Sequence, residues 1–172
     1  MGRGLELSTL EGANVYIICA GTGVLPFIDL INYLLLRSII AVLKKSGKNT
    51  DGFKDLGVNF DGLEGVKIFF FGSFADEEEF LGKEIILKLV EINKKYNLNI
   101  FSIVLKQLKK VSNQDQYSSV TFHSGHFDSE FFKKHFQVQG DNYFVCGPPA
   151  FNQCVPKALK ENGVYPERIT LV

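Results

Sequence analysis

Residues 15–26 read VYIICAGTGVLP, and the architecture of the chain can be worked out from this stretch. The first six residues form a short apolar run, partly β-branched, which is typical of a buried strand. The run ends at Gly21-Thr22-Gly23. Pro26 follows at a position where the first turn of a helix loses nothing by lacking an N–H. The stretch therefore predicts a buried strand, a glycine turn and a long helix.

The same alternation of strand and helix continues along the chain. Four further apolar runs predict strands, at 66–72 (VKIFFFG), 99–105 (NIFSIVL), 142–146 (NYFVC) and 168–172 (RITLV). Helices are expected at 77–96, 128–136 and 149–162, and Asp128 is the expected N-cap of the second of these. The segment 46–65 is rich in Gly, Asn and Asp and predicts an inserted loop, and 106–122 predicts a polar loop.

This order of elements predicts an α/β fold: a three-layer, doubly wound, parallel five-stranded sheet in the order 3-2-1-4-5. In that order the first and fourth strands are neighbours at the point where the winding reverses. Ligands of such folds bind beyond the carboxyl ends of the strands at that point. The loops that follow these two strands are therefore the first places to look for chemistry.

The composition excludes several classes of protein. The chain has 172 residues, 45% of them hydrophobic and 22% charged, and its formal net charge is zero. This is typical of a soluble globular domain and lacks the basic excess of a nucleic-acid-binding protein. The apolar segment 27–43 is interrupted by Asp29, Asn32 and Arg37, which favours a buried helix over a membrane span.

The cysteines indicate the compartment. Cys19, Cys146 and Cys154 are three in number, which is no disulfide framework. Reduced thiols in the cytoplasm, or on the cytosolic face of a membrane, are the simplest interpretation.

The loop Gly21-Thr22-Gly23 offers donors for a phosphate. Its glycines allow the backbone to approach a ligand closely, and the helix start presents free amides and a positive dipole end to a pyrophosphate. The residues alone are equally compatible with a glycine turn that only joins a strand to a helix, because the full G-x-G-x-x-G pattern is absent.

The loop Cys146-Gly147-Pro148-Pro149 follows the fourth predicted strand. Gly147 permits close contact at the strand end, and the thiol of Cys146 could pack against a planar ring. In isolation the same residues fit a buried structural cysteine followed by a turn. Because both loops are expected at the carboxyl ends of neighbouring strands, together they predict a site that holds both ends of a dinucleotide.

Three stretches carry a resemblance to a known family. The Gly-Thr-Gly-x-x-Pro pattern at 21–26, the Cys-Gly-Pro-Pro pattern at 146–149 and the tail ENGVYPERIT at 161–170 resemble the NAD(P)-binding domain of the ferredoxin reductase superfamily, in its NADH–cytochrome b5 reductase and nitrate reductase branch. The resemblance covers nearly the whole chain except 46–65. Residues 1–10 look like the end of a missing flavin-binding barrel, which leaves 11–172 as the NAD(P)-binding domain.

The resemblance implies a flavin-dependent oxidoreductase that passes hydride from NAD(P)H to FAD and then electrons to a haem or other one-electron acceptor. FAD would be held mainly by the upstream domain. The pyrophosphate would lie on Gly21, Thr22 and Gly23, with Pro26 near the flavin. Cys146 would orient the nicotinamide as the residue at the reacting ring, beside the other cofactor-binding positions of its loop, Gly147, Pro148 and Pro149.

The adenosine end departs from the family pattern. Ser73 and Phe74 stand where the family has other residues; Ser73 could bond a ribose hydroxyl and Phe74 could pack on adenine. Lys106 follows the third strand, where it could meet a phosphate or could be a solvated lysine. The choice between NADH and NADPH stays open, with a lean toward NADH from the family branch.

Two further interpretations compete with this one. The insert at 46–65 is similar to that of ferric reductases and NADPH oxidases, whose equivalent domains are attached to a membrane bundle. A non-catalytic descendant of the fold that binds a partner is the second. His123 and His126 form a His-x-x-His pair without a cysteine cluster nearby, so no metal site is expected.

Overall fold

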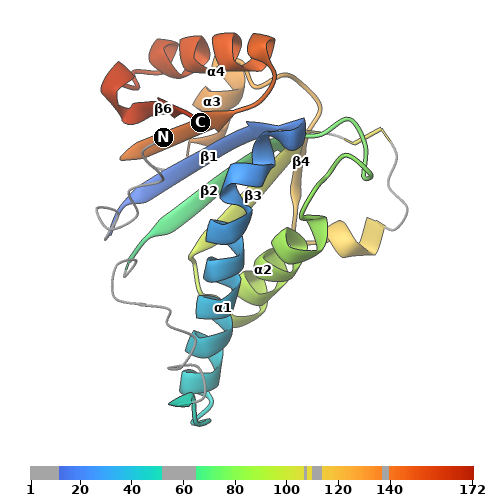
Figure 1. Ribbon diagram of the computed structural model, residues 1–172, viewed down its shortest axis with the longest axis vertical. Coiled ribbons are helices and arrows are strands. Elements are labelled where there is room, and N and C mark those ends of the chain that lie inside the picture. The colour runs from blue at the N-terminus through green and yellow to red at the C-terminus, as the bar shows by residue number, and fades with distance from the viewer. Residues whose placement is uncertain (1–11, 52–64, 107, 110–113, 137–139) are drawn as a thin grey trace.

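The computed structural model describes residues 12–51, 65–106, 108–109, 114–136 and 140–172 (Figure 1). Segment 1–10, interpreted above as the end of a flavin-binding barrel, lies outside these residues. So does most of the insert at 46–65.

The strands form one six-stranded sheet in the order β4-β3-β2-β1-β5-β6. All neighbouring strands pair in parallel. Their bounds are β1 Asn14–Ala20, β2 Lys67–Ser73, β3 Phe101–Lys106, β4 Thr121–His123, β5 Asn142–Cys146 and β6 Ile169–Leu171. The predicted class and the predicted order of five strands are confirmed, with β5 and β6 as the fourth and fifth.

The predicted number of strands is wrong by one, because β4 lies where a polar loop was expected. Thr121–His123 is too short to show a periodic pattern, and two of its three residues are polar. It becomes a strand by pairing with the outer edge of β3, where Phe122 is the partner of Leu105. The ring of Phe122 also lies 5.7 Å from that of Tyr117, which anchors the strand from its outer side.

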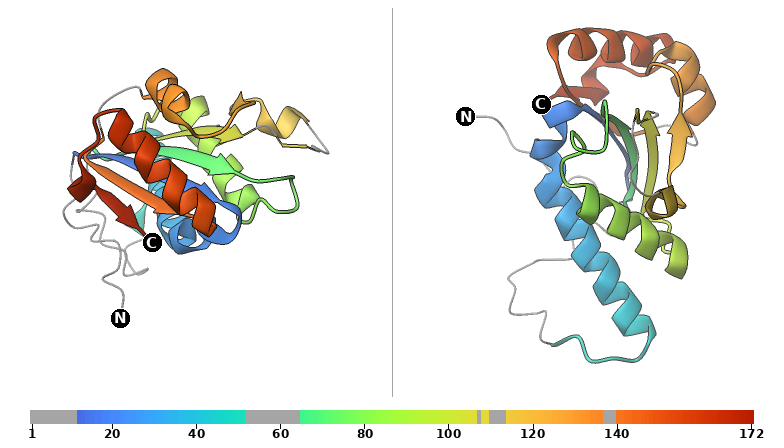
Figure 2. Two further views of the ribbon diagram at one scale, coloured as in Figure 1. Left: turned by 90° about the horizontal axis from the view of Figure 1, so that it is seen from above. Right: turned by 90° about the vertical axis from the view of Figure 1, so that its right-hand side faces the viewer.

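The helices cover both faces of the sheet, which confirms the three layers (Figure 2). Helices α1 (Ile28–Lys45) and α2 (Lys83–Tyr96) lie on one face, and α3 (Ser129–His135) and α4 (Pro149–Glu161) on the other. Short 3-10 helices are η2 (Gly21–Phe27), η5 (Gln114–Tyr117) and η6 (Pro166–Arg168). Helix α2 begins six residues later than the predicted start at 77, because the preceding residues form turns.

Strand β1 is buried on both faces, which explains why its residues are nearly all apolar. Val15, Ile17 and Cys19 pack into the core on the α1/α2 side. The alternate side chain of Tyr16 packs on the α3/α4 side, stacked between two aromatic rings of the neighbouring strands at 4.6 and 5.1 Å. A strand buried on both faces cannot alternate apolar and polar residues, and the sequence reflects this.

Helix α1 is strongly apolar and is partly buried in the fold. The segment Gly21–Lys45 is long and apolar enough to cross a membrane, judged by length and composition alone. In the structure Leu30, Ile31 and Leu34 are buried in the core formed with the sheet and α2. Part of the helix is thus built into the core, and 39% of its most apolar 18-residue window is buried.

The buried side chain of Asn93 ties α2 to the start of β3. Its Nδ2 donates to Leu89 O at 3.0 Å, and its Oδ1 accepts from the backbone N–H groups of Ile100 at 3.0 Å and Phe101 at 3.1 Å. We expect Asn93→Ala to lower the free energy of unfolding by about 2–3 kcal/mol, because backbone donors would be left unsatisfied. Urea denaturation checks this. Glu91→Ala, on the exposed face of the same helix, should cost far less.

Candidate functional site

The carboxyl ends of the strands lie in one row along one edge of the sheet. Cys19 is the register partner of Cys146 on one side and of Gly72 on the other, and Gly72 is in turn the partner of Leu105. The loops that leave β1, β2, β3 and β5 therefore open onto the same edge. This is the arrangement that the predicted strand order required.

The two loops at the centre of this edge touch each other directly. A Cβ atom added at Gly23 would overlap the carbonyl oxygen of Cys146 and would lie 2.9 Å from the backbone nitrogen of Gly147. The peptide of one loop thus packs on the peptide of the other, and only glycine fits between them. The two loops therefore lie side by side at the carboxyl edge of the sheet.

Gly147 is similarly confined. A Cβ at this position would lie 2.7 Å from Cδ1 of Phe151 and 3.2 Å from the Cβ of Ala20. The end of β1 and the first turn of α4 therefore pack around a backbone with no side chain. A side chain at this position would collide with Phe151.

Two helix starts point at this edge. Helix η2 begins at Gly21 and runs directly into α1, and α4 begins at Pro149. The residues that precede them, Ala20 and Pro148, provide no side-chain cap. The first amide groups of a helix lack partners within the helix, and the dipole makes this end positive. An anionic group is therefore stabilised at this edge.

A groove of about 650 Å³ extends from the two loops across the ends of β2 and β3. One wall is α4 and the other is the loop that enters α3. We call it the α4 groove, and its lining residues are Ala20, Ser73, Lys106, His126, Phe127, Asp128, Ser129, Pro148, Ala150, Phe151, Cys154, Val155, Lys157, Ala158 and Glu161. Its floor and walls are mainly apolar, with charged groups placed along them.

The structure brings most of the sequence-predicted residues together. Gly21, Thr22 and Gly23 lie beside the loop formed by Cys146, Gly147, Pro148 and Pro149. Ser73 and Lys106 line the α4 groove together with Pro148. Pro26 is exposed at the end of η2, on the same edge.

Phe74 is placed elsewhere. Its side chain is only 3% exposed and its ring stacks on that of Phe80, with 4.3 Å between ring centroids. It belongs to the core on the α1/α2 side and does not line the groove. The ring of Phe80 covers the face of the Phe74 ring that could have packed against an adenine.

Other groove residues were not identified from the sequence. His126 and Asp128 come from the loop before α3, and Phe151, Cys154 and Lys157 come from the outer face of α4. Asp128 was expected only as a helix cap, and its Oδ1 does accept from Phe131 N at 2.9 Å. The signal available in the sequence was the spacing of 151, 154 and 157–158, which lie on one side of a helix.

The thiols near the edge are held in the neutral form. Burial raises the pKa of Cys146 above its usual value. Burial, and then the neighbouring Cys146, raise the pKa of Cys19 well above its usual value. A protonated thiol is a poor nucleophile. The chemistry that suits Cys146 is therefore contact with a ring and not covalent attack.

Two histidines that are distant in the sequence lie close together in the fold. Rings of His123 and His135 lie 5.5 Å apart. Among the residues that the structure describes, no group of three His, Cys, Asp or Glu side chains could hold a metal ion.

Burial, and then the charge of His123, lower the pKa of His135 below 6.5. The folded protein thus binds fewer protons than the unfolded chain just below pH 6.5, and stability falls as the pH falls through that window. We expect the midpoint of urea denaturation to decrease between pH 7 and pH 5.5, and His135→Gln to reduce that decrease. The exposed His126 provides the control, because His126→Gln should keep the wild-type pH dependence. Equal decreases in wild type and His135→Gln would refute the assignment.

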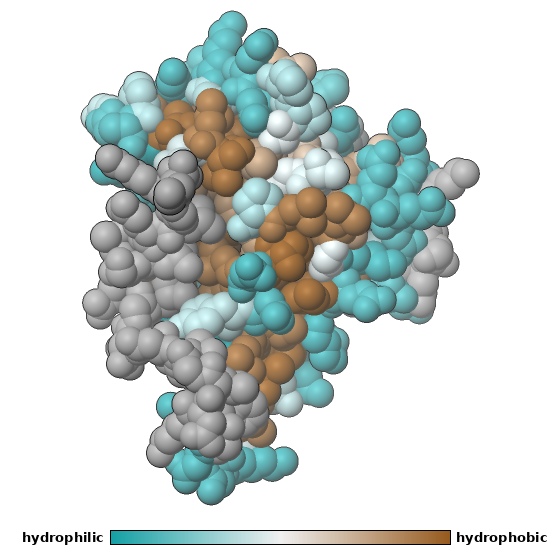
Figure 3. Space-filling model, viewed as in Figure 1, coloured by the Kyte–Doolittle hydropathy of each residue, from teal (hydrophilic) through white to brown (hydrophobic). Residues whose placement is uncertain are grey.

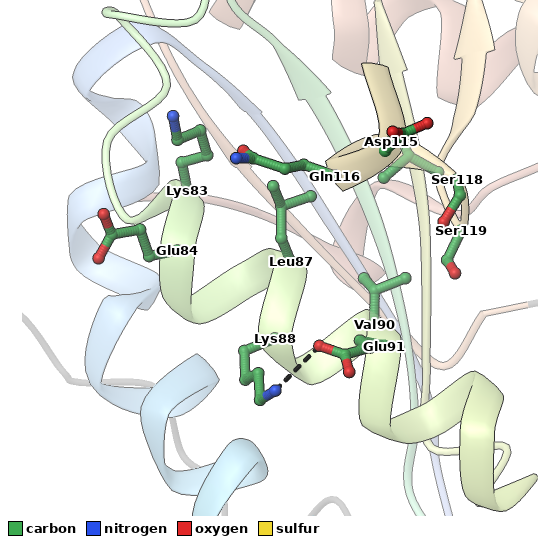
Figure 4. Close-up of a pocket in the computed structure, with 11 residues that line it drawn as sticks. Lys83, Glu84, Leu87, Lys88, Val90, Glu91, Asp115, Gln116, Ser118 and Ser119 are labelled. Atoms are coloured by element: carbon green, nitrogen blue, oxygen red, sulfur yellow. Dashed lines mark hydrogen bonds and ion pairs between the residues drawn. The ribbon is translucent and has the colours of Figure 1, made fainter. Parts of the chain in front are cut away.

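A second hollow, of about 560 Å³, lies between α2 and the segment 115–120 (Figure 4). Two of its charged side chains, Lys88 and Glu91, pair with each other at 2.9 Å. Lys83 pairs with Glu77, also at 2.9 Å. It is separate from the carboxyl edge of the sheet, and we assign no chemistry to it.

Comparison with known proteins agrees with this geometry. No family model matches the sequence. The chain is 23% identical over 168 residues to sulfhydrogenase 2 subunit gamma of Pyrococcus furiosus, which covers 98% of this chain and 50% of that subunit. The chain thus spans about half the length of this curated relative.

Solved structures share the fold. The cytochrome b5 reductase domain of Ulva prolifera nitrate reductase matches with a TM-score of 0.58 and 14% identity, over 93% of this chain and 48% of that one. The CS-b5R domains of human Ncb5or in an NAD+ form match with a TM-score of 0.60 and 15% identity, over 99% and 39%. Flavohemoglobin from Malassezia yamatoensis, with bound FAD and heme, matches with a TM-score of 0.57 and 19% identity, over 96% and 33%.

The chain therefore has the fold found in part of each of these cytochrome b5 reductase, nitrate reductase and flavohemoglobin structures. The resemblance seen in the Gly-Thr-Gly-x-x-Pro and Cys-Gly-Pro-Pro patterns is confirmed at the level of the fold.

Proposed function

We propose that this chain is the nicotinamide-dinucleotide-binding domain of a flavin-dependent oxidoreductase in the cytoplasm. One observation carries the proposal: the glycine loop after β1 and the Cys146-Gly147 loop after β5 are in backbone contact at the head of the α4 groove. A dinucleotide has a pyrophosphate between two ring systems. The site offers helix starts for the former, and the Cys146-Gly147 loop and a groove for the latter.

The residues present fit this ligand. Gly21, Thr22 and Gly23 bind the pyrophosphate through backbone amides and the exposed Thr22 hydroxyl. Cys146 and Gly147 form the surface for the nicotinamide, where the neutral thiol orients the ring. At the other end Ser73 and Lys106 line the place for adenosine, and Phe74 takes no part because Phe80 covers it.

A bound nicotinamide supplies the hydride and a flavin accepts it, so the share of this chain is positioning. The flavin would be FAD held by a neighbouring domain, and the electrons would pass to a haem or another one-electron acceptor. Relatives about twice as long as this chain support the presence of a further domain.

An apolar rim surrounds the proposed meeting point of the two domains. Leu25 is 54% exposed, and Leu171 and Val172 are 56% and 44% exposed. Val172 lies next to β5, since its N–H donates to Val145 O at 3.0 Å. Apolar surface is visible beside the C-terminal strand and along α1 (Figure 3). These side chains would be covered by the flavin-binding domain.

The proposal is tested by titrating the 172-residue chain with NADH and with ADP-ribose, followed by intrinsic fluorescence or calorimetry. We expect saturable binding that ADP-ribose competes for. In the longer protein with its flavin domain, Cys146→Ala should lower hydride transfer about tenfold while ADP-ribose still binds, because the ring loses its orienting contact. No nucleotide binding would favour a partner-binding domain, and hydride transfer unchanged in Cys146→Ala would refute the orienting role of Cys146.

A further inference from the structure

We infer that the α4 groove selects a nucleotide with a 2′-phosphate on its adenosine, and thus NADPH over NADH. This inference rests on the proposed function and goes beyond it, because the loops that hold a pyrophosphate and a nicotinamide are indifferent to the 2′ position. The observations behind it are the two lysines that line the groove, Lys106 and Lys157, and the absence of a carboxylate at the ends of β2 and β3.

Three basic side chains from three different elements line the groove. Lys106 comes from the end of β3, His126 from the loop before α3, and Lys157 from the third turn of α4. The ion pairs seen among the described residues join Lys83 with Glu77 and Lys88 with Glu91, and neither uses a groove lysine. The ammonium groups of Lys106 and Lys157 are therefore available to a ligand.

The groove lining also contains two acids, Asp128 and Glu161. Asp128 caps α3 through its bond from Phe131 N at 2.9 Å, so its carboxylate is directed at a helix start. Glu161 is the other acid of the lining, and it is exposed in the last turn of α4. The end of the groove that borders the sheet, at Ser73 and Lys106, carries a lysine and no acid.

The strand ends also lack the acid that selects an unphosphorylated ribose. In dinucleotide-binding α/β folds an Asp or Glu near a strand end bonds the ribose 2′-hydroxyl, whereas a basic residue there accommodates a 2′-phosphate. Here β2 ends at Ser73 and β3 ends at Lys106. A carboxylate would repel the phosphate, and neither strand end provides one.

Acidic residues follow β2 closely, but their carboxylates bond to other residues of the same turn. Asp76 Oδ1 accepts from the N–H groups of Glu78 and Glu79, each at 3.1 Å. Glu79 Oε2 accepts from Ala75 N at 3.2 Å, and Glu77 pairs with Lys83. None of these carboxylates lines the groove. A 2′-phosphate, which carries about −1.5 to −2 charges at neutral pH, would therefore meet the Lys106 ammonium at an end of the groove whose lining has no carboxylate.

The test uses adenosine phosphates that differ only at the ribose. The 172-residue chain is titrated calorimetrically with 5′-AMP, adenosine 2′,5′-bisphosphate and adenosine 3′,5′-bisphosphate. We expect the 2′,5′-bisphosphate to bind about tenfold more tightly than 5′-AMP, through charge-assisted hydrogen bonds to the lysines. The 3′,5′-bisphosphate has the same charge and should gain little. NADPH should likewise bind more tightly than NADH.

Two variants test whether Lys106 and Lys157 cause the preference for the 2′-phosphate. Lys106→Gln and Lys157→Gln should each reduce the ratio of the affinity for the 2′,5′-bisphosphate to the affinity for 5′-AMP severalfold. Lys160→Gln removes the same charge from α4 outside the groove lining and is the matched control. Two lysines on different elements guard against a variant that fails to fold.

Each outcome is decisive. Equal affinities for 5′-AMP and the 2′,5′-bisphosphate, or equal gains for both bisphosphates, would overturn the inference while the proposed function stands. An unchanged preference in both groove variants would also overturn it. If no adenosine phosphate and no NADH binds, the proposed function itself fails and the inference fails with it.

Discussion

Gly23→Ala should weaken dinucleotide binding by about 100-fold, since small displacements of positioning groups have effects of this size. The added methyl group would overlap the carbonyl oxygen of Cys146, which is backbone and cannot rotate away. One of the two loops must therefore move, and the phosphate site separates from the nicotinamide site. Overpacking of this kind should also lower the free energy of unfolding by about 1–3 kcal/mol.

Calorimetric titration with ADP-ribose and NADH checks the loss of affinity, and urea denaturation checks the loss of stability. Gly163→Ala is the control, because Gly163 has φ +81° and open space around it at the end of α4. That variant should lose about 1 kcal/mol of stability from backbone strain and keep its affinity. Wild-type affinity in Gly23→Ala would show that the contact between the loops does not hold the site together.

Phe71→Ala should produce the largest loss of stability, about 3–5 kcal/mol. Phe71 is 2% exposed in β2, and its ring lies 5.1 Å from Phe131 and 6.1 Å from Phe132 in α3. Its removal leaves a cavity between the sheet and α3 that these aromatic rings cannot fill. The midpoint of thermal or urea denaturation measures the effect.

The same variant should also affect the site. Phe127 lies 6.3 Å from Phe71 and lines the α4 groove, so a loosened α3 displaces one wall of the groove. Leu81→Ala serves as the control, because Leu81 is 37% exposed and should change stability by about 0.5 kcal/mol or less. A loss below about 1 kcal/mol in Phe71→Ala would mean that the aromatic cluster repacks around the missing ring.

The proposed function and the inferred 2′-phosphate preference concern different parts of one site. The contact between Gly23 and the Cys146-Gly147 peptide lies at the centre of the sheet edge, where the phosphate and the ring are proposed to bind. The charges of Lys106 and Lys157 lie along the groove. The family resemblance alone favoured NADH, whereas the distribution of charge in the folded chain favours NADPH.

The adenosine end shows where prediction from sequence stopped. Lys106 was recognised as a possible phosphate ligand because it follows a strand, and it lines the groove. Phe74 was assigned to adenine by the same reasoning, yet it is buried against Phe80. Phe74 directly follows β2, and Lys106 is the last residue of β3. The local sequence therefore does not distinguish the two positions. Whether a side chain at a strand end turns outward or into the core depends on what packs beside it.

Local patterns were sufficient for the parallel order of five strands, the helices on both faces, the cap at Asp128 and the two loops at neighbouring strand ends, because each rests on residues adjacent in the chain. Contacts between distant segments were needed for the rest. The edge strand β4 exists through its pairing with β3, and Lys157 reaches the groove through the packing of α4 on the sheet. Such contacts depend on the energy of the whole packed chain, which short sequence windows do not contain.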